Sequence, residues 1–380
     1  MENNICYYLG FSHCLGIGPI KFQALIKYFG TVKNAYQANI NKIQKIVGTK
    51  TGEKFSLFRA KFDPVKKLEE LKRKNISVIS NADNIYPQSL KNISDPPICL
   101  YIKGNIDTAT QFSNIEKARH RVSRPPHSNS LIFFAIVGTR TPTPYGEQIT
   151  RKFSNELTQA GFIIVSGMAM GIDTIAHKGC LEVNGKTIAV LGCGVDIIYP
   201  ASNVRLYQEI IEKEGLVISE FPPGHMVLKG LFIARNRIIS GLSKGVLIVE
   251  GLKDSGALIT ARYAAEQGKD VFATPAPINS PFSQAPNLLL KQGAKLVTSV
   301  EDITEELGLK ILPKKKEEIY LQLNNEEKII FELLQKEPLM VDEIAIETKQ
   351  TINETLNLVS LLEIKGVIEK NSQGRYQIRL

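Results

Sequence analysis

The stretch that decides the fold runs from Leu131 to Thr274, where four short apolar runs are each followed by a loop of small and polar residues. They are LIFFAIV (131–137) with GTR (138–140), FIIV (162–165) with SGMAMGID (166–173), TIAVL (187–191) with GCG (192–194), and GVLIV (245–249) with Glu250 and Ser255-Gly256. In an open parallel sheet, ligands bind at the carboxyl ends of the strands. Glycine-bearing loops at that edge gather backbone N–H groups around a phosphate. The sequence therefore predicts a phosphate-binding crevice.

Helical stretches alternate with these apolar runs, which is typical of an α/β fold with a mostly parallel sheet. The expected helices cover Tyr145–Ala160, Ile175–Asn184, Val204–Glu214, Ala234–Leu242, Ala257–Gln267 and Asn287–Gln292. Two short strands, Ile76–Ser80 and Ile98–Ile102, are expected upstream. We expect this α/β domain to span residues 76–308.

Residues 1–75 read as a separate helical domain. The segment Cys14–Lys21 contains Gly16-Ile17-Gly18 between two apolar-periodic runs. Such a turn is found in helix-hairpin-helix modules, whose backbone amides can hold a DNA phosphate. An ordinary helical turn in a module used for protein contact fits equally well, so both interpretations stay open.

The tail predicts a winged helix over residues 325–380, after a polar linker at 309–324. Helices are expected at Glu326–Gln335, Val341–Glu347 and Ile352–Lys365, and a hairpin at Val367–Glu369 and Arg375–Ile378. The last helix carries Glu354 and Glu363 against Lys365 alone. This composition favours protein contact or regulation over reading the DNA major groove.

Charge is unevenly distributed along the 380 residues. The net charge is +9, but residues 315–380 carry nine Lys/Arg against twelve Asp/Glu, a net of −3. The preceding residues therefore carry +12, and a polyanionic partner should bind there. A basic segment at about 105–130, with Lys117, Arg119 and Arg121, reads as a linker or loop.

The composition also indicates where the chain works. Five cysteines, with no CxxC pair, favour free thiols in a reducing compartment. No apolar run reaches membrane-spanning length, and Met1-Glu2-Asn3-Asn4 lacks the features of a signal peptide. We therefore expect a cytoplasmic protein with no membrane partner.

Two groups of residues are candidates for contacting a polyanion. Arg140 follows a glycine at the end of the first long strand, where a guanidinium can bind a phosphate in bidentate fashion. Lys229 and Phe232 offer one charge for a backbone phosphate and one aromatic face for a base. Arg235 and Arg237 lie two residues apart, so one is expected to face the crevice and the other to brace the sheet or an acidic partner.

Catalytic and cofactor motifs are weak. Asp173 and His177 lie four residues apart with Ser166 upstream, but Ser166 lacks the Gly-x-Ser-x-Gly elbow of a hydrolase. We expect Asp173 to cap a helix and His177 to make a structural hydrogen bond. No cluster has metal-ligand spacing, and no Gly-x-Gly-x-x-Gly fingerprint follows the first strand. No metal, cofactor or catalytic residue is predicted.

Several motifs together resemble the DprA/Smf family, the DNA-processing protein A family. They are AIVGTR (135–140), SGMAMGID (166–173) with Ala176-His177, KTIAVLG (186–192) with Tyr199-Pro200 and Asn203, RNRIISGLS (235–243), and Glu250 with Ser255-Gly256-Ala257. Upstream, Tyr86-Pro87, Asp95-Pro96-Pro97 and Lys103-Gly104 also fit.

The resemblance implies an extended Rossmann-like domain between a helical (helix-hairpin-helix or SAM-like) domain and a winged helix. It implies a protein that binds single-stranded DNA without sequence preference, protects it and promotes RecA loading in DNA uptake and recombination. It also implies a homodimer formed through the Rossmann domain and no chemical turnover. The DNA-binding residues would be Arg140, Lys229, Phe232, Arg235, Asn236, Arg237, Gly138, Thr139, Ser166, Gly167, Gly192, Ser255 and Gly256.

Two other functions remain alternatives. The Rossmann variant also resembles that of phosphoribohydrolases that cleave nucleoside monophosphates, in which case Glu250 with Ser255-Gly256 would be the remnant of a site. A nucleotide sensor that signals through the winged helix is the third reading.

Overall fold

The structure is a computed structural model that describes residues 2–105, 132–309, 320, 323–335, 337–371 and 374–378. The predicted basic segment at about 105–130, apart from Asn105, and most of the predicted linker at 309–324 lie outside these residues. The chain divides into two compact units, Met1–Ile311 and Leu312–Leu380.

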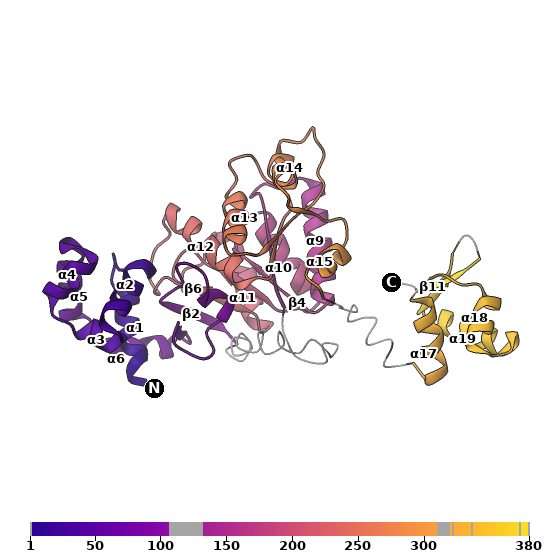
Figure 1. The fold of residues 1–380 in the computed structure, drawn as a ribbon, viewed down its shortest axis with the longest axis horizontal. Coiled ribbons are helices and arrows are strands. Elements are labelled where there is room, and N and C mark those ends of the chain that lie inside the picture. The colour runs from indigo at the N-terminus through magenta and orange to yellow at the C-terminus, as the bar shows by residue number, and fades with distance from the viewer. Residues whose placement is uncertain are drawn as a thin grey trace. The chain divides into compact units, whose positions relative to one another are not determined.

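A nine-stranded sheet organises the first unit (Figure 1), with the strand order β1-β2-β6-β5-β4-β3-β7-β8-β9. Six successive pairs from β6 to β9 are parallel, whereas β1 pairs with β2 and β2 with β6 in antiparallel fashion. This confirms the predicted mostly parallel α/β fold. The strands are β1 Ser77–Ser80, β2 Cys99–Gly104, β3 Ile132–Val137, β4 Phe162–Ser166, β5 Thr187–Val190, β6 Leu216–Ser219, β7 Gly245–Ile248, β8 Asp270–Ala273 and β9 Lys295–Leu296.

Helices cover both faces of this sheet, as β3 shows. Its odd-numbered residues Phe133 and Ala135 join one apolar cluster, while Phe134 and Ile136 join another. Successive side chains of a strand point to opposite faces, so a strand buried on both sides must be apolar throughout. The helices are α9 Pro144–Gln159, α10 Ile172–Glu182, α11 Val204–Glu212, α12 Lys229–Leu242, α13 Gly256–Glu266, α14 Gln284–Lys291 and α15 Val300–Glu306, with the short α7 Gln88–Lys91 upstream.

The N-terminal region is helical, as predicted, and has its own core. Phe11 lies at its centre, stacked on Phe55 and edge-on to Phe22 and Tyr36. The core continues onto the first sheet strands through Tyr101, whose hydroxyl lies 2.8 Å from Ser12 Oγ. The helices are α1 Glu2–His13, α2 Pro19–Phe29, α3 Val32–Gln37, α4 Ile40–Val47, α5 Thr49–Lys61 and α6 Pro64–Arg73.

Two features of the first unit differ from the sequence expectations. The strands β6, β8 and β9 were not predicted. Short apolar runs do not distinguish a strand from a helix by periodicity, and no glycine follows β6 or β8 as closely as Gly192 follows the equally short β5. Helix α12 begins at Lys229 rather than Ala234. Its start has no side-chain cap, so the sequence carries no signal for it.

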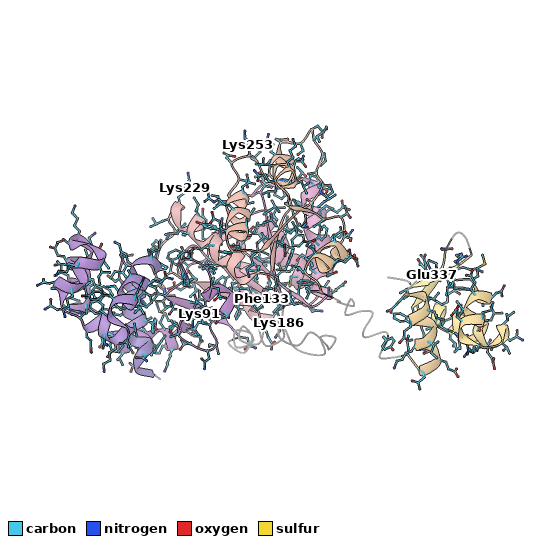
Figure 2. All side chains as sticks on the ribbon, viewed as in Figure 1. Lys91, Phe133, Lys186, Lys229, Lys253 and Glu337 are labelled. Carbon is cyan, nitrogen blue, oxygen red and sulfur yellow. The ribbon has the colours of Figure 1, made fainter. Side chains whose placement is uncertain are left out.

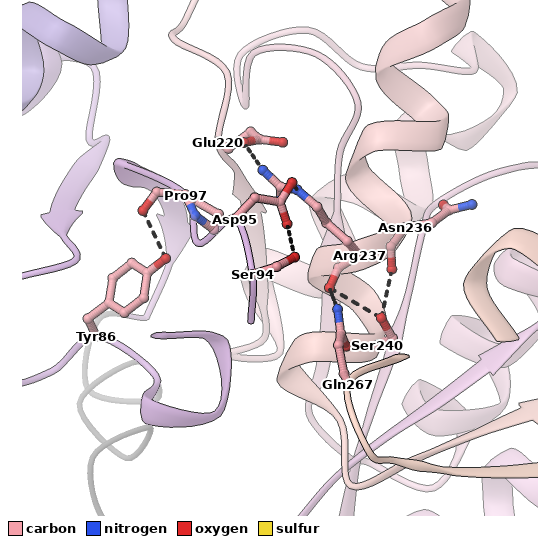
Figure 3. Close-up of polar contacts among 9 residues, drawn as sticks. All are labelled: Tyr86, Ser94, Asp95, Pro97, Glu220, Asn236, Arg237, Ser240 and Gln267. Atoms are coloured by element: carbon pink, nitrogen blue, oxygen red, sulfur yellow. Dashed lines mark hydrogen bonds and ion pairs between the residues drawn. The ribbon is translucent and has the colours of Figure 1, made fainter. Parts of the chain in front are cut away.

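Arg237 on α12 holds together three segments that are distant in sequence (Figure 3). Its Nε donates to Asp95 at 2.8 Å, and its terminal nitrogen Nη2 donates to Glu220 at 2.6 Å. The Gln267 amide donates to the Arg237 carbonyl at 3.0 Å. The Arg237 side chain is only 5% exposed and that of Glu220 is 9% exposed, so this ion pair is buried.

Among its described residues, the second unit has the helices α17, α18 and α19 and a hairpin, packed around Ile330, Phe331 and Leu358. Leu339 pairs with Tyr376 as an isolated bridge, which ties the segment before α18 to the hairpin. This arrangement confirms the predicted winged helix. Its elements are α17 Asn325–Leu334, α18 Val341–Thr348, α19 Ile352–Ile364, β10 Ile368–Lys370 and β11 Tyr376–Ile378.

The buried pair gives a stability prediction. We expect Arg237→Ala to lower the free energy of unfolding by about 3–5 kcal/mol, because it leaves the Glu220 carboxylate buried without its counter-charge. Asp95→Asn should cost less, since Asp95 is 30% exposed and solvent screens its charge. Urea denaturation of both variants measures the two values, and equal small losses would contradict the role given to Arg237.

Candidate nucleic-acid interface

A pocket of about 570 Å³ opens where the chain leaves β3 and β7. These neighbours lie where the strand order reverses direction, since the chain proceeds from β3 to β4 on one side and returns to β7 on the other. Ligands of open α/β sheets bind at such a switch point. The pocket collects nine of the predicted residues, namely Gly138, Thr139, Arg140, Lys229, Phe232, Arg235, Asn236, Ser255 and Gly256.

Phe232 lies close to two of the charged side chains of this pocket. The guanidinium carbons of Arg140 and Arg235 lie 5.9 Å and 6.0 Å from its ring centroid. The Tyr199 ring lies 5.4 Å away, tilted by 40°. The two cations are within the distance at which a guanidinium is attracted to an aromatic face. The pocket therefore combines aromatic faces with positive charge.

Tyr199 was not among the predicted site residues, although it lines the pocket and is 45% exposed. It belongs to the loop after β5 and meets Phe232, which is 33 residues further along the chain, only in the folded structure. The one feature of the sequence that could have pointed to Tyr199 is its place in the Tyr199-Pro200 motif.

Arg140 and Lys229 are the exposed cations among the described residues that line the pocket. Figure 2 labels Lys229 at the outer edge of the first unit. Asp254 is the exposed acid of the lining, so the local positive charge is modest. These two side chains can each bind a phosphate without first breaking an ion pair within the described residues.

Arg235 lies beneath the pocket, where it is 4% exposed. Its guanidinium donates hydrogen bonds to the backbone carbonyls of Gly167 and Val190. Burial lowers the pKa of Arg235, and the nearby Asp173 carboxylate acts in the opposite direction. Arg235 therefore ties the loop after β4 and the last residue of β5 to α12, and it places positive charge 6.0 Å from the Phe232 ring centroid.

The other predicted arginine, Arg237, is absent from the pocket lining. Its guanidinium is buried against Asp95 and Glu220. The expectation that Arg237 contacts DNA does not fit this placement, because both carboxylates would have to be left unpaired in the interior. The structure matches instead the expectation that one arginine of the pair meets an acidic partner.

Ser166, Gly167 and Gly192 also lie outside the pocket lining, but the two glycines shape what lies in it. A Cβ atom at Gly167 would lie 2.6 Å from the guanidinium carbon of Arg235. One at Gly192 would lie 2.9 Å from Phe232 Cδ1 and 3.2 Å from the Phe232 backbone. Both side chains need the space that a missing Cβ leaves.

The start of α13 forms one wall of the pocket. The Ser255 hydroxyl accepts a hydrogen bond from the Ala257 N–H at 3.2 Å, which caps the helix. Asn236 donates to the Gly256 carbonyl at 3.2 Å and joins α12 to this wall. Helix N-termini favour anions because their N–H groups and dipole are positive there.

The residues considered for catalysis have structural contacts. The Ser166 hydroxyl donates to the Ile136 carbonyl at 2.7 Å. The Asp173 carboxylate accepts from the N–H groups of Gly167 and Ala169, and Gly171 rather than Asp173 is the N-cap of α10. Ser166 therefore donates to the backbone rather than to a base.

His177 is fully buried and is structural, as expected. Its Nδ1 lies 2.7 Å from the Thr187 hydroxyl, which donates to the Ile164 carbonyl at 2.7 Å. The Thr187 hydroxyl donates its only proton to the Ile164 carbonyl. His177 Nδ1 must therefore be protonated and donate to the Thr187 oxygen. Burial and, to a smaller degree, Arg235 lower the pKa of His177 to about 3.

Glu250 also has a structural role. Its carboxylate accepts from the Thr143 N–H at 2.9 Å and the Thr143 hydroxyl at 2.6 Å, at the start of α9. Its backbone carbonyl accepts from the Thr139 N–H at 2.7 Å. A Cβ atom at Gly138 would lie 2.9 Å from that carbonyl oxygen. Through these contacts, Glu250 fixes the loop between β3 and α9.

Comparisons with known proteins agree with this geometry. A family model described as DNA recombination-mediator protein A matches residues 125–308, and a DprA winged helix domain model matches residues 315–374. Protein Smf of Synechocystis is 36% identical over 411 residues, covering 98% of each chain. The chain belongs to the DprA/Smf family.

Two solved DprA structures are similar to this family member. The X-ray structure of DNA processing protein A from Streptococcus pneumoniae is 34% identical with a TM-score of 0.66, covering 80% of this chain and 98% of that one. The Helicobacter pylori protein, whose structure concerns its binding of single-stranded DNA, is 33% identical with a TM-score of 0.50. It matches 61% of this chain and 95% of its own. Within the described residues, no helix is long and apolar enough to span a membrane.

The buried histidine gives a pH prediction. An unfolded histidine binds its proton near pH 6.5, but folded His177 does so only near 3. The free energy of unfolding should therefore fall as the pH drops below 6.5, by about 1.4 kcal/mol per pH unit for this group. Denaturation of wild type and His177→Gln between pH 7 and 5 measures it. A slope that His177→Gln leaves unchanged would contradict the assignment.

Proposed function

We propose that this family member binds single-stranded DNA, without sequence preference, in the pocket between the ends of β3 and β7. The observation that carries the proposal is the aromatic ring of Phe232 with the guanidinium carbons of Arg140 and Arg235 at 5.9 Å and 6.0 Å from its centroid, and with the exposed Lys229 three residues away. The binding of single-stranded DNA described for the Helicobacter pylori relative supports it.

The chemistry of the pocket suits an unpaired strand. Base stacking on an aromatic ring contributes about 1–3 kcal/mol per base and tolerates every base, because each has a π-face. The cations and the start of α13 suit phosphates, which carry no sequence information. The bases of a duplex are already stacked and paired, so their faces are not available to Phe232 or Tyr199.

We further propose that binding protects the strand and promotes loading of the RecA recombinase, and that the protein acts as a homodimer through the Rossmann-like domain. The family assignment supports these proposals. Strand exchange by RecA on DNA covered with a single-strand-binding protein tests the loading, and sedimentation equilibrium tests the dimer.

The phosphoribohydrolase and the nucleotide sensor remain the alternatives. The structural contacts of Glu250 with Thr143 argue against its use in cleavage. Incubation with AMP and detection of free base distinguishes the hydrolase, and tight binding of a mononucleotide with weak binding of oligonucleotides distinguishes the sensor.

Fluorescence anisotropy of labelled dT oligonucleotides, with duplex as competitor, tests the proposal directly. We expect the protein to bind the oligonucleotide, and we expect duplex not to displace it. The Phe232→Ala substitution should weaken the binding free energy by about 1–3 kcal/mol. Phe232→Tyr keeps the ring and should stay close to wild type. Displacement by duplex, or an unchanged affinity of Phe232→Ala, would reject the proposed site.

The salt dependence of the same binding tests the two exposed cations. Each phosphate that a side chain neutralises on a single strand adds about 0.7 to the slope of log affinity against log salt. Arg140→Ala and Lys229→Ala should therefore each weaken binding and flatten this slope by about 0.7.

Lys91→Ala is the matched control for both variants. Lys91 is an exposed lysine on the same unit and lies outside the pocket lining (Figure 2). Its removal changes the net charge of the protein as much as that of Lys229. If all three substitutions changed the slope equally, the charge effect would be a property of the whole surface rather than of the pocket.

A further inference from the structure

The second unit exposes large apolar side chains on the outer face of α19. Ile352, Leu356, Leu361 and Ile364 are 52%, 40%, 48% and 82% exposed. They belong to one helix of thirteen residues. Exposed apolar surface of this kind commonly marks a site of interaction with another molecule.

The core of the unit does not need these four side chains. The inner face of α19 is formed by Thr355, Leu358, Val359 and Leu362, which follow the spacing of one helix face and are all buried. The core around them contains Ile330, Phe331 and Ile344. The outer apolar residues are therefore free to contact a partner.

The segment that carries this face is acidic. Residues 341–364, which include α18 and α19, contain five acidic residues and one lysine, a net of −4. Helix α19 itself contains no lysine or arginine. The phosphates of a DNA duplex would be repelled by this surface, since helices that enter the major groove rely on cations for contact with the backbone.

Much of this negative charge is available to a partner. Glu343 pairs with Arg375, and the Glu354 carboxylate caps the start of α19 through Thr351. Asp342, Glu347 and Glu363 make no salt bridge within the described residues. Glu363 is exposed and lies beside the apolar residues on α19.

We propose that the outer face of α19 docks a basic amphipathic helix of a partner protein. The apolar side chains of α19 would receive the apolar face of that helix, and its lysines or arginines would pair with Glu363 and the acids of α18. Charge complementarity selects this occupant. A second copy of the same face would place like charges against each other, and DNA would be repelled.

A model peptide tests this docking on the full-length protein. The probe is a labelled peptide of leucine and lysine, about five helical turns long, with its leucines on one face. A peptide of the same composition in scrambled order is the control for charge alone. We expect the amphipathic peptide, and not the scrambled one, to bind in fluorescence anisotropy.

Three variants locate the binding. Leu356→Gln with Ile364→Gln should weaken it about tenfold or more, as loss of buried apolar contacts at an interface does. Glu363→Lys should weaken it about threefold or more by removing an attraction and adding a repulsion. Glu337→Lys makes the same change of charge on an exposed residue outside α19 (Figure 2) and should leave binding unchanged.

Other results would overturn the proposal. Equal affinity of wild type and the double variant would show that the peptide binds elsewhere, and equal binding of the scrambled peptide would show that charge alone, and not the apolar face, accounts for the binding. A loss of duplex binding in the double variant would assign the face to DNA. A change in oligomeric mass of the double variant in sedimentation would assign it to a second copy of the chain. None of these readouts depends on single-stranded DNA binding.

Discussion

The buried guanidinium of Arg235 is the interaction on which the site depends. By donating to the carbonyls of Gly167 and Val190, it fixes α12 to the carboxyl ends of the neighbouring strands β4 and β5. These carbonyls lie where the β-ladder ends, so they would otherwise lack a donor in a place that solvent does not reach. Residue 167 must be a glycine because the Arg235 guanidinium occupies the space that a Cβ atom would take. The same hydrogen bonds position Phe232, which lies one turn earlier on α12.

Arg235 and Arg237 lie on the same helix but have different roles, because their guanidinium groups contact different partners. Arg235 meets carbonyls and keeps its charge beneath the pocket, whereas Arg237 meets two carboxylates and is neutralised by them. The exposed positive charge of the pocket lining comes from Arg140 and Lys229, far fewer cations than the +12 of the first 314 residues suggests. A pocket with few cations must gain much of its affinity from stacking and backbone dipoles.

The sequence was informative where one local pattern determines the structure. Apolar strands that end in glycine loops predicted the sheet and most of the pocket, because burial on both faces and phosphate-binding loops leave that pattern. It failed where contacts join distant segments. Arg237 meets Asp95, 142 residues away, and nothing in the spacing of Arg235 and Arg237 tells which of them faces acid. Tyr199 joins the site for the same reason, through a contact between the loop after β5 and Phe232 on α12.

The two units have opposite net charge, which fits the two different partners that we propose for them. A pocket that binds phosphates and stacks bases accepts any strand, so it carries no information about when or where the protein should act. Such information must come from a surface that discriminates between proteins, by apolar complementarity together with charge. The outer face of α19 has both properties, since its exposed apolar side chains belong to a helix whose charged residues, Glu354 and Glu363, are both acidic. Its acidity also keeps nucleic acid from competing for that surface, which a basic winged helix would not achieve.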